Sequence, residues 1–146
     1  MEKDFTFYPT TQSKLNLLTL DQVESYNKDG YLNSIPLFVG DQVATNRVYF
    51  DGLLAHALAQ GKSSYSISGS HVIYSGVYDL VKSSVLLDLA EDLLGPNFVA
   101  IGAHYFCKLP KDSKVVSWHQ DFTYWPVDRA KIITIWVAID DVDREN

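Results

Sequence analysis

Two residues able to bind a metal ion stand close together in the second half of the chain: His119 and Asp121, with Gln120 between them. On an extended backbone, residues two apart project from the same face, so the imidazole nitrogen and the carboxylate oxygen can bind one ion together. This spacing supplies two of the three protein ligands of the 2-His-1-carboxylate triad that holds Fe(II) in non-haem oxygenases. The motif is therefore a candidate metal site.

The residues around the motif bear on this interpretation. Aromatic side chains bracket the triplet, at Trp118, Phe122, Tyr124 and Trp125, and the apolar segment KIITIWVAIDD begins at Lys131. In a simpler interpretation, His119 and Asp121 are surface residues of a strand edge and the aromatic residues fill the core. The third ligand of the triad should be a histidine from a later strand, but no histidine follows position 119. The site therefore looks incomplete.

Composition limits the class of protein to which this chain can belong. The 146 residues are 47% hydrophobic and 21% charged, which is typical of a globular chain, and we expect a single domain over 1–146. The net charge of -6 and the scattered Lys and Arg residues argue against nucleic acid as a partner. Cys107 is the one cysteine, and we expect a buried structural thiol there. Without an apolar leader or a membrane-spanning run, a cytoplasmic protein with no membrane partner is expected.

Helices are predicted mainly in the first two thirds of the chain. Thr19 and Gln22 fit a capping box, and the helix that follows should end at Asp29-Gly30. A short helix is predicted over 52–60, where His56 is expected to be a packed or surface residue. Ser83 or Ser84 should cap a third helix, which Gly95-Pro96 terminates.

Strands are predicted later in the sequence. Apolar and aromatic residues favour a strand within 98–108, a turn at 109–112, and a strand over 114–119 that leads into the triplet. The run IITIWVAI over 132–139 is typical of a buried strand, with Thr134 as its polar exception. Helices followed by strands indicate an α+β fold.

The motifs together resemble the phytanoyl-CoA dioxygenase family. The resemblance rests on a series of stretches in order, HVIYSGVYDLVKSSVLLDLAEDLLGPN, HYFCKLP, VSWHQDFTYWP and IWVAIDDVDREN, and on the opening LTLDQVESYNKDGYL. It covers most of the chain and is least distinctive over 32–70. It implies an Fe(II)- and 2-oxoglutarate-dependent dioxygenase on a double-stranded β-helix, or jelly roll, with O2 and a small organic or acyl molecule as its substrates.

The resemblance also implies roles for individual residues. His119 and Asp121 match the first two iron ligands, and the acidic residue favours hydroxylation over halogenation, because halogenating relatives carry a small residue there. Trp136 and His104 match positions that line or contact the 2-oxoglutarate site, and Gln120 and Lys108 are weaker candidates for it. For these four residues the alternatives are structural: a core tryptophan, an ordinary strand histidine and solvated polar side chains.

The same resemblance calls for further elements after Asn146: a Gly-rich turn, more strands, the distal histidine, and an arginine that pairs with the far carboxylate of 2-oxoglutarate. We therefore expect helices plus the first strands of a jelly roll, apparently truncated, in a chain that is inactive by itself. Two alternatives remain: a non-catalytic remnant that forms a homodimer by strand pairing, and a jelly-roll binding module. The sequence does not identify the substrate.

Overall fold

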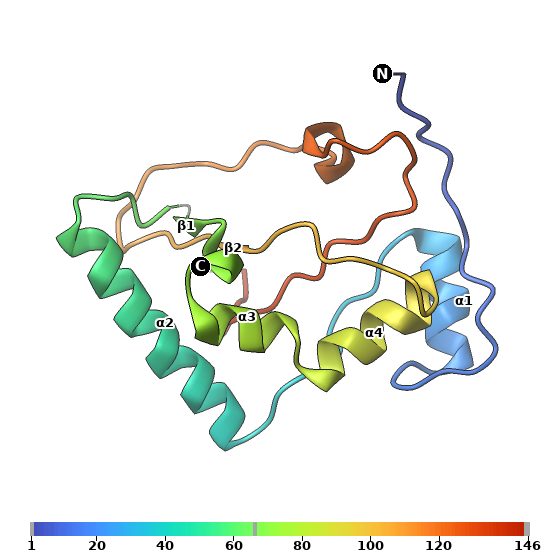
Figure 1. Cartoon of the computed structure of the whole chain (residues 1–146), viewed down its shortest axis with the longest axis horizontal. Coiled ribbons are helices and arrows are strands. Elements are labelled where there is room, and N and C mark those ends of the chain that lie inside the picture. Colours follow the sequence, from blue (N-terminus) through green and yellow to red (C-terminus); the bar gives the residue numbers. More distant parts are fainter. Residues whose placement is uncertain (1, 66, 145–146) are drawn as a thin grey trace. The chain divides into compact units, whose positions relative to one another are not determined.

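The computed structural model describes residues 2–65 and 67–144, which divide into two compact units. Unit 1 comprises the residues up to Ile35, Ser83–Val99 and Val116–Ile135; unit 2 comprises Pro36–Lys82, Ala100–Val115 and the residues from Trp136 on. Both units are therefore assembled from segments far apart in the sequence, and the helices and short strands are labelled in Figure 1.

The first helix of unit 1, α1 (Leu20–Asp29), confirms its predicted start and end. Thr19 accepts a hydrogen bond from the backbone of Gln22, whose side chain accepts one from the backbone of Thr19 in return. Gly30 follows with φ 80°, a left-handed conformation that glycine adopts without strain. Local side-chain and backbone chemistry therefore sets both ends of this helix.

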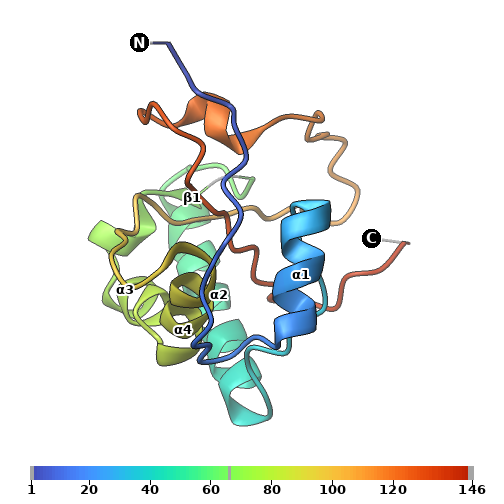
Figure 2. The same ribbon diagram turned by 90° about the vertical axis from the view of Figure 1, so that its right-hand side faces the viewer.

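The helix α4 (Ser84–Leu94) gives unit 1 its most buried charged residue, Asp92. The Asp92 side chain is 1% exposed, and its carboxylate accepts hydrogen bonds from the backbone N–H groups of Asn16, Leu17 and Leu18 at 2.7–2.8 Å. These bonds tie the irregular segment before α1 to α4, and Figure 2 shows that segment running into α1. Ser83 occupies the predicted N-cap position but makes no capping side-chain bond.

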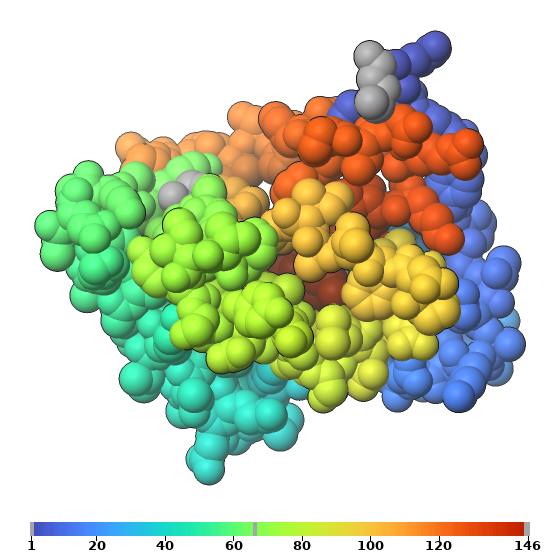
Figure 3. All heavy atoms as spheres, viewed as in Figure 1, coloured from blue at the N-terminus to red at the C-terminus, as the bar shows by residue number. Residues whose placement is uncertain are grey.

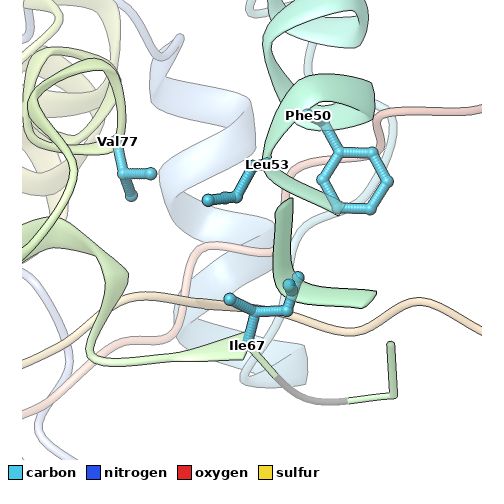
Figure 4. Packing of buried hydrophobic residues seen from close by; sticks show 5 residues of the cluster. Phe50, Leu53, Ile67 and Val77 are labelled. Atoms are coloured by element: carbon cyan, nitrogen blue, oxygen red, sulfur yellow. The ribbon is translucent and has the colours of Figure 1, made fainter. Parts of the chain in front are cut away.

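In unit 2, the long helix α2 (Asp41–Ala59) begins eleven residues before the predicted start at Gly52. Its first half, DQVATNRVYFD, lacks a continuous apolar stripe, so hydrophobic periodicity did not reveal it. Phe50 and Leu53 of α2 form a buried cluster with Ile67 and with Val77 of α3 (Ser75–Val81), as Figure 4 shows. Burial of these side chains holds the helices of unit 2 together.

Only a small part of the predicted sheet is present in the described residues. The strand β1 (Ile67–Ser68) pairs antiparallel with β2 (His104–Tyr105), with Ile67 opposite Tyr105. The strand predicted within 98–108 is thus reduced to two residues. The turn at 109–112 is confirmed by a hydrogen bond from the N–H of Asp112 to the carbonyl of Leu109 at 2.9 Å.

The strand predictions over 114–119 and 132–139 are wrong for the described structure, which assigns no strand to either range. The second range is also not fully buried, because half-buried and exposed residues alternate from Ile133 to Asp140. Alternation with a period of two is the pattern of extended backbone with one covered face. The apolar run therefore does not form the predicted buried strand, because strand assignment requires a neighbouring strand to pair with.

Two further expectations concern Cys107 and the fold class. Cys107 is half-buried against the cluster of unit 2 rather than fully buried, and burial raises the pKa of its thiol. Helices together with a two-stranded sheet are consistent with the α+β prediction. Among the described residues, no helix combines the length and apolar character needed to cross a membrane.

Candidate functional site

The His119-Gln120-Asp121 triplet lies where extended backbone turns into a short 3-10 helix, η2 (Asp121–Tyr124), in unit 1. Gln120 is extended, with φ -109° and ψ 117°, and its carbonyl accepts hydrogen bonds from the backbone N–H and the hydroxyl of Thr123. The prediction of an extended triplet therefore fails at its last residue, because Asp121 begins the helical turn. The turn nevertheless keeps the two candidate ligands on the same side.

The imidazole of His119 and the carboxylate of Asp121 face each other directly. Nε2 of His119 lies 3.0 Å from Oδ1 of Asp121, and the two side chains are 36% and 45% exposed. When two ligand atoms each lie about 2.1 Å from one metal ion and the two metal–ligand bonds form a right angle, the ligand atoms are about 3 Å apart. The pair thus has the spacing of neighbouring ligands of one metal ion.

Contacts behind the pair fix the orientation of both side chains. The carbonyl of Ser117 lies 2.7 Å from Nδ1 of His119, and since a carbonyl only accepts, Nδ1 carries a proton that it donates. Asp121 accepts a hydrogen bond on its other oxygen, Oδ2, from the hydroxyl of Thr134 at 2.6 Å. Metal-binding histidines commonly donate a hydrogen bond from the N–H of their second ring nitrogen in this way, and metal-binding carboxylates commonly accept a further hydrogen bond.

This arrangement calls for a cation between the two facing atoms. With the Nδ1 proton committed to Ser117, neutral His119 would present the lone pair of Nε2 to a carboxylate oxygen. A proton on Nε2 or a metal ion relieves that repulsion. The hydrogen bond to Ser117 and the hydrogen bond and negative charge of Asp121 accordingly raise the pKa of His119 above its ordinary value.

The residues present fit part of a metal centre. An imidazole nitrogen and a carboxylate oxygen are ligands of the kind that non-haem Fe(II) sites use. Over residues 2–65 and 67–144, however, no group of three or more His, Cys, Asp and Glu side chains is arranged to hold a metal ion. His119 and Asp121 therefore account for two ligands and leave the rest of the coordination sphere open.

The aromatic residues beside the pair divide between core and surface. Phe122 is buried, with 7% of its surface exposed, whereas Trp118 is fully exposed and Tyr124 is 73% exposed. The ring of Tyr124 packs edge-on against the imidazole of His119, with centroids 5.6 Å apart. The interpretation that these aromatic residues fill the core is therefore wrong for Trp118 and Tyr124.

The four residues assigned to 2-oxoglutarate fall in different units. Gln120 belongs to unit 1 with the metal pair and is exposed, whereas Trp136, His104 and Lys108 belong to unit 2. Trp136 is 66% exposed, so it is not a core residue, and the ring of His104 on β2 contacts Phe106 at a centroid distance of 4.4 Å. Their roles in binding 2-oxoglutarate stay predictions.

Sequence reasoning missed three groups that contact the motif or the turn after it: the Ser117 carbonyl, the Thr134 hydroxyl, and the ammonium group of Lys3, which donates to the carbonyl of Phe122. A signal existed for Thr134, which is the one polar residue in the apolar run over 132–139. A backbone carbonyl carries no signal in the residue type, and Lys3 lies more than a hundred residues away from the motif. Only folding brings Thr134 and Lys3 to this part of the chain, whereas the Ser117 carbonyl is already close because it lies two residues before His119.

Comparison with known proteins gives the family context of the site. The family model described as phytanoyl-CoA dioxygenase (PhyH) matches residues 55–146, a range that contains all six candidate site residues. A probable alpha-ketoglutarate-dependent hypophosphite dioxygenase of Stutzerimonas stutzeri is 25% identical over 80 residues, which cover 55% of this chain and 28% of that protein. The peroxisomal phytanoyl-CoA dioxygenase of Mus musculus is 26% identical over 155 residues, covering 90% of this chain and 45% of that protein.

The chain thus spans less than half the length of each of these two curated relatives. No solved structure matches the chain. The family match and the alpha-ketoglutarate dependence named for one relative imply Fe(II) and 2-oxoglutarate, as the sequence analysis expected.

Proposed function

Since the chain belongs to the phytanoyl-CoA dioxygenase family, we propose that it forms part of an Fe(II)- and 2-oxoglutarate-dependent dioxygenase that acts on a small molecule. The proposal includes a jelly-roll domain to which this chain contributes helices and the first extended segments. The relatives' names point to oxygenases, which favours this function over a binding module or a non-catalytic dimer.

One observation carries the proposal: Nε2 of His119 and Oδ1 of Asp121 converge at 3.0 Å while hydrogen bonds hold each side chain from behind. We assign these two residues as iron ligands, and we assign Trp136, His104, Gln120 and Lys108 to the 2-oxoglutarate site.

Each residue of the metal pair has a definite task in this proposal. Fe(II) and 2-oxoglutarate supply the activation of O2 for oxidation of the substrate. The carbonyl of Ser117 keeps the proton on Nδ1 and so leaves Nε2 of His119 available as a ligand. The hydroxyl of Thr134 occupies Oδ2 of Asp121 and leaves Oδ1 directed at the same point.

The proposed reaction is hydroxylation of a small organic or acyl substrate. Asp121 supplies the carboxylate ligand that a halogenating relative would lack, so a hydroxylating site is the better match. The names of the two relatives refer to substrates as different as hypophosphite and an acyl thioester. Family membership therefore points to 2-oxoglutarate as the co-substrate but does not define the chemical class of the substrate.

Turnover of 2-oxoglutarate tests the proposal. The protein encoded by the complete native gene should release succinate from 2-oxoglutarate only with Fe(II) and O2, and His119→Ala and Asp121→Ala should abolish this activity. Suitable controls are His56→Ala on α2, whose ring bonds to Gln60, and Asp79→Ala on the exposed face of α3. Succinate release by Asp121→Ala at the wild-type rate would refute the assignment of the iron ligands.

A second arm uses the 146-residue chain itself. With two ligands in place, we expect it to bind divalent metal weakly and to decarboxylate 2-oxoglutarate no faster than free Fe(II). Succinate formation well above that of free Fe(II) would show that the metal site is completed in another way, for example by a partner chain.

A further inference from the structure

The first residues of the chain make a set of contacts with the metal motif that the function proposed above does not use. We call residues Lys3–Tyr8 the N-terminal strap. It lies outside the range 55–146 that matches the family model, yet it belongs to unit 1 together with η2. Figures 1 and 3 show the N-terminal segment, in dark blue, beside the orange segment that contains η2.

Lys3 makes the central contact of the strap. Its ammonium group donates hydrogen bonds to the backbone carbonyls of Phe122, Thr123 and Trp125 at 2.7, 3.0 and 2.7 Å. An ammonium group has three donors, so the hydrogen-bonding capacity of Lys3 is used entirely at this turn. Carbonyls at the end of a helix lack partners within the helix, and a lysine is well suited to satisfy them.

The neighbours of Lys3 fasten the strap to the same part of the chain. The backbone of Asp4 pairs with the segment 128–130, donating to the carbonyl of Asp128 at 2.7 Å and accepting from the N–H of Ala130 at 3.0 Å. The ring of Phe5 packs edge-on against Phe122, with centroids 5.0 Å apart. The ammonium group of Lys3, the backbone of Asp4 and the ring of Phe5 therefore all contact the short stretch 122–130, which follows the motif.

The strap is itself ordered by its own hydrogen bonds. The carboxylate of Asp4 accepts from the N–H of Thr6 at 2.9 Å and from the hydroxyl of Tyr8 at 2.5 Å. These bonds curl the segment around Asp4. Lys3 and Phe5, on either side of that residue, are thus held against the turn that begins at Asp121.

We propose that Lys3 is a positioning residue of the metal site: by binding the carbonyls of η2, it fixes the turn that places Oδ1 of Asp121 opposite Nε2 of His119. The inference rests on the function proposed for His119 and Asp121. Without the ammonium group, the carbonyls of Thr123 and Trp125 lose this donor and the carbonyl of Phe122 keeps only the bond from the N–H of Trp125 at 3.3 Å. Asp121, at the start of that turn, is then held less firmly opposite His119. Metal affinity should then fall although neither ligand has changed.

The test compares variants of the 146-residue chain in titrations with Co(II), which stands in for the oxygen-sensitive Fe(II), by calorimetry at pH 7.5. Lys3→Met removes the charge and keeps the length of the side chain. Lys3→Arg keeps the charge and donors. Lys14→Met is the matched control, since Lys14 is an exposed lysine of the same N-terminal region. Asp121→Ala removes a ligand and reports on the metal site itself.

Loss of a group that directly supports a metal ligand commonly lowers metal affinity about 10- to 100-fold. Lys3 acts one step further away, so we expect Lys3→Met to raise the Kd for Co(II) roughly threefold to tenfold. Lys3→Arg should recover most of the affinity, and Lys14→Met should match the wild type. Melting temperatures measured without metal separate this effect from a loss of stability, because a purely structural lysine would change the melting temperature and leave the Kd unchanged.

The outcomes distinguish the two proposals. If Asp121→Ala loses affinity while Lys3→Met binds as the wild type does, the role of Lys3 is refuted and the metal site stands. If Lys14→Met weakens binding as much as Lys3→Met, the effect is one of general charge, and the role of Lys3 is again refuted.

If wild type and Asp121→Ala bind Co(II) equally, the metal assignment itself fails. Should Lys3→Met not fold, Lys3→Gln removes the ammonium group while keeping a polar side chain, and an unchanged Kd in that variant would overturn the proposal.

Discussion

Two aspartates of unit 1 show how one side chain can serve the fold or a candidate active site. Asp92 is 1% exposed, and its carboxylate accepts three backbone N–H groups. The side chain of Asp121 is 45% exposed, and one of its oxygens faces a histidine nitrogen that also acts as an acceptor when neutral. The first carboxylate is buried and bound by backbone donors, whereas the second is partly exposed, accepts from the hydroxyl of Thr134 and faces Nε2 of His119, where we propose that a metal ion binds. The partners of a carboxylate, rather than its type, indicate its task.

The largest effect that this comparison predicts is a change in the free energy of unfolding. Asp92→Ala should lower the free energy of unfolding by about 3 kcal/mol or more, because three backbone donors lose a charged acceptor in a buried environment. Urea denaturation measures this difference, with Asp88→Ala on the same helix as the control, expected to cost under about 1 kcal/mol. Equal stability of the two variants would contradict the structural role of Asp92.

Asp121→Ala should show the opposite pattern. We expect its stability to stay within about 1 kcal/mol of the wild type, because the side chain is partly exposed, while the affinity for Co(II) falls at least about tenfold. Calorimetry and urea denaturation of the same preparation give both numbers. A large loss of stability would place Asp121 in the same structural class as Asp92.

Metal binding should also depend on pH through His119. Its pKa is raised above the ordinary value of 6.5, so a proton occupies Nε2 at a higher pH than in a free histidine. Since proton and metal compete for that nitrogen, affinity for Co(II) should decline as the pH falls through the raised pKa, by about tenfold per pH unit below it. Titrations between pH 8 and 5.5 (roughly the range over which histidines titrate) test this. A pH-independent Kd would exclude His119 as a ligand.

A smaller effect is expected at Thr134. Thr134→Val keeps the shape of the side chain and removes the hydroxyl that donates to Oδ2 of Asp121. Affinity for Co(II) should fall about tenfold, which is less than in Asp121→Ala because the ligand remains but loses a group that supports it directly. Thr45→Val on the exposed face of α2 provides a control, because Thr45 lies in unit 2, away from the metal motif in the sequence. Equal effects of the two variants would refute the specific role of Thr134.

The smallest prediction concerns Asp4 in the N-terminal strap. Hydrogen bonds from Thr6 and Tyr8 lower the pKa of its carboxyl from 3.8 to about 2. Because the folded-state pKa is the lower one, the stability that Asp4 contributes is present above pH 3.8 and is lost as the pH falls towards about 2. The difference in stability between wild type and Asp4→Asn should therefore shrink over this interval. A constant difference would show that the Asp4 charge is not involved.

Several features could be predicted because they depend on neighbouring residues in the sequence. The capping box of Thr19 and Gln22, the exit at Gly30, and the end of α4 before Gly95 are set within one helical turn. The predictions over 114–119 and 132–139 failed because strand assignment depends on a partner that the local sequence does not specify. The start of α2 was missed because its first half carries no apolar stripe.

The sequence by itself determined which side chains can bind a metal ion, because the chemistry of His119 and Asp121 is a property of residue type and their proximity follows from a spacing of two. It also carried the family resemblance that the comparison confirmed. Tertiary structure decided how Asp121 is held: only after folding does the hydroxyl of Thr134 donate to its Oδ2 and the ammonium group of Lys3 bind carbonyls of the turn that begins at Asp121. These hydrogen bonds join segments that are apart in the sequence, and no local pattern specifies them, whereas the contact of His119 with the carbonyl of Ser117 is made within two residues.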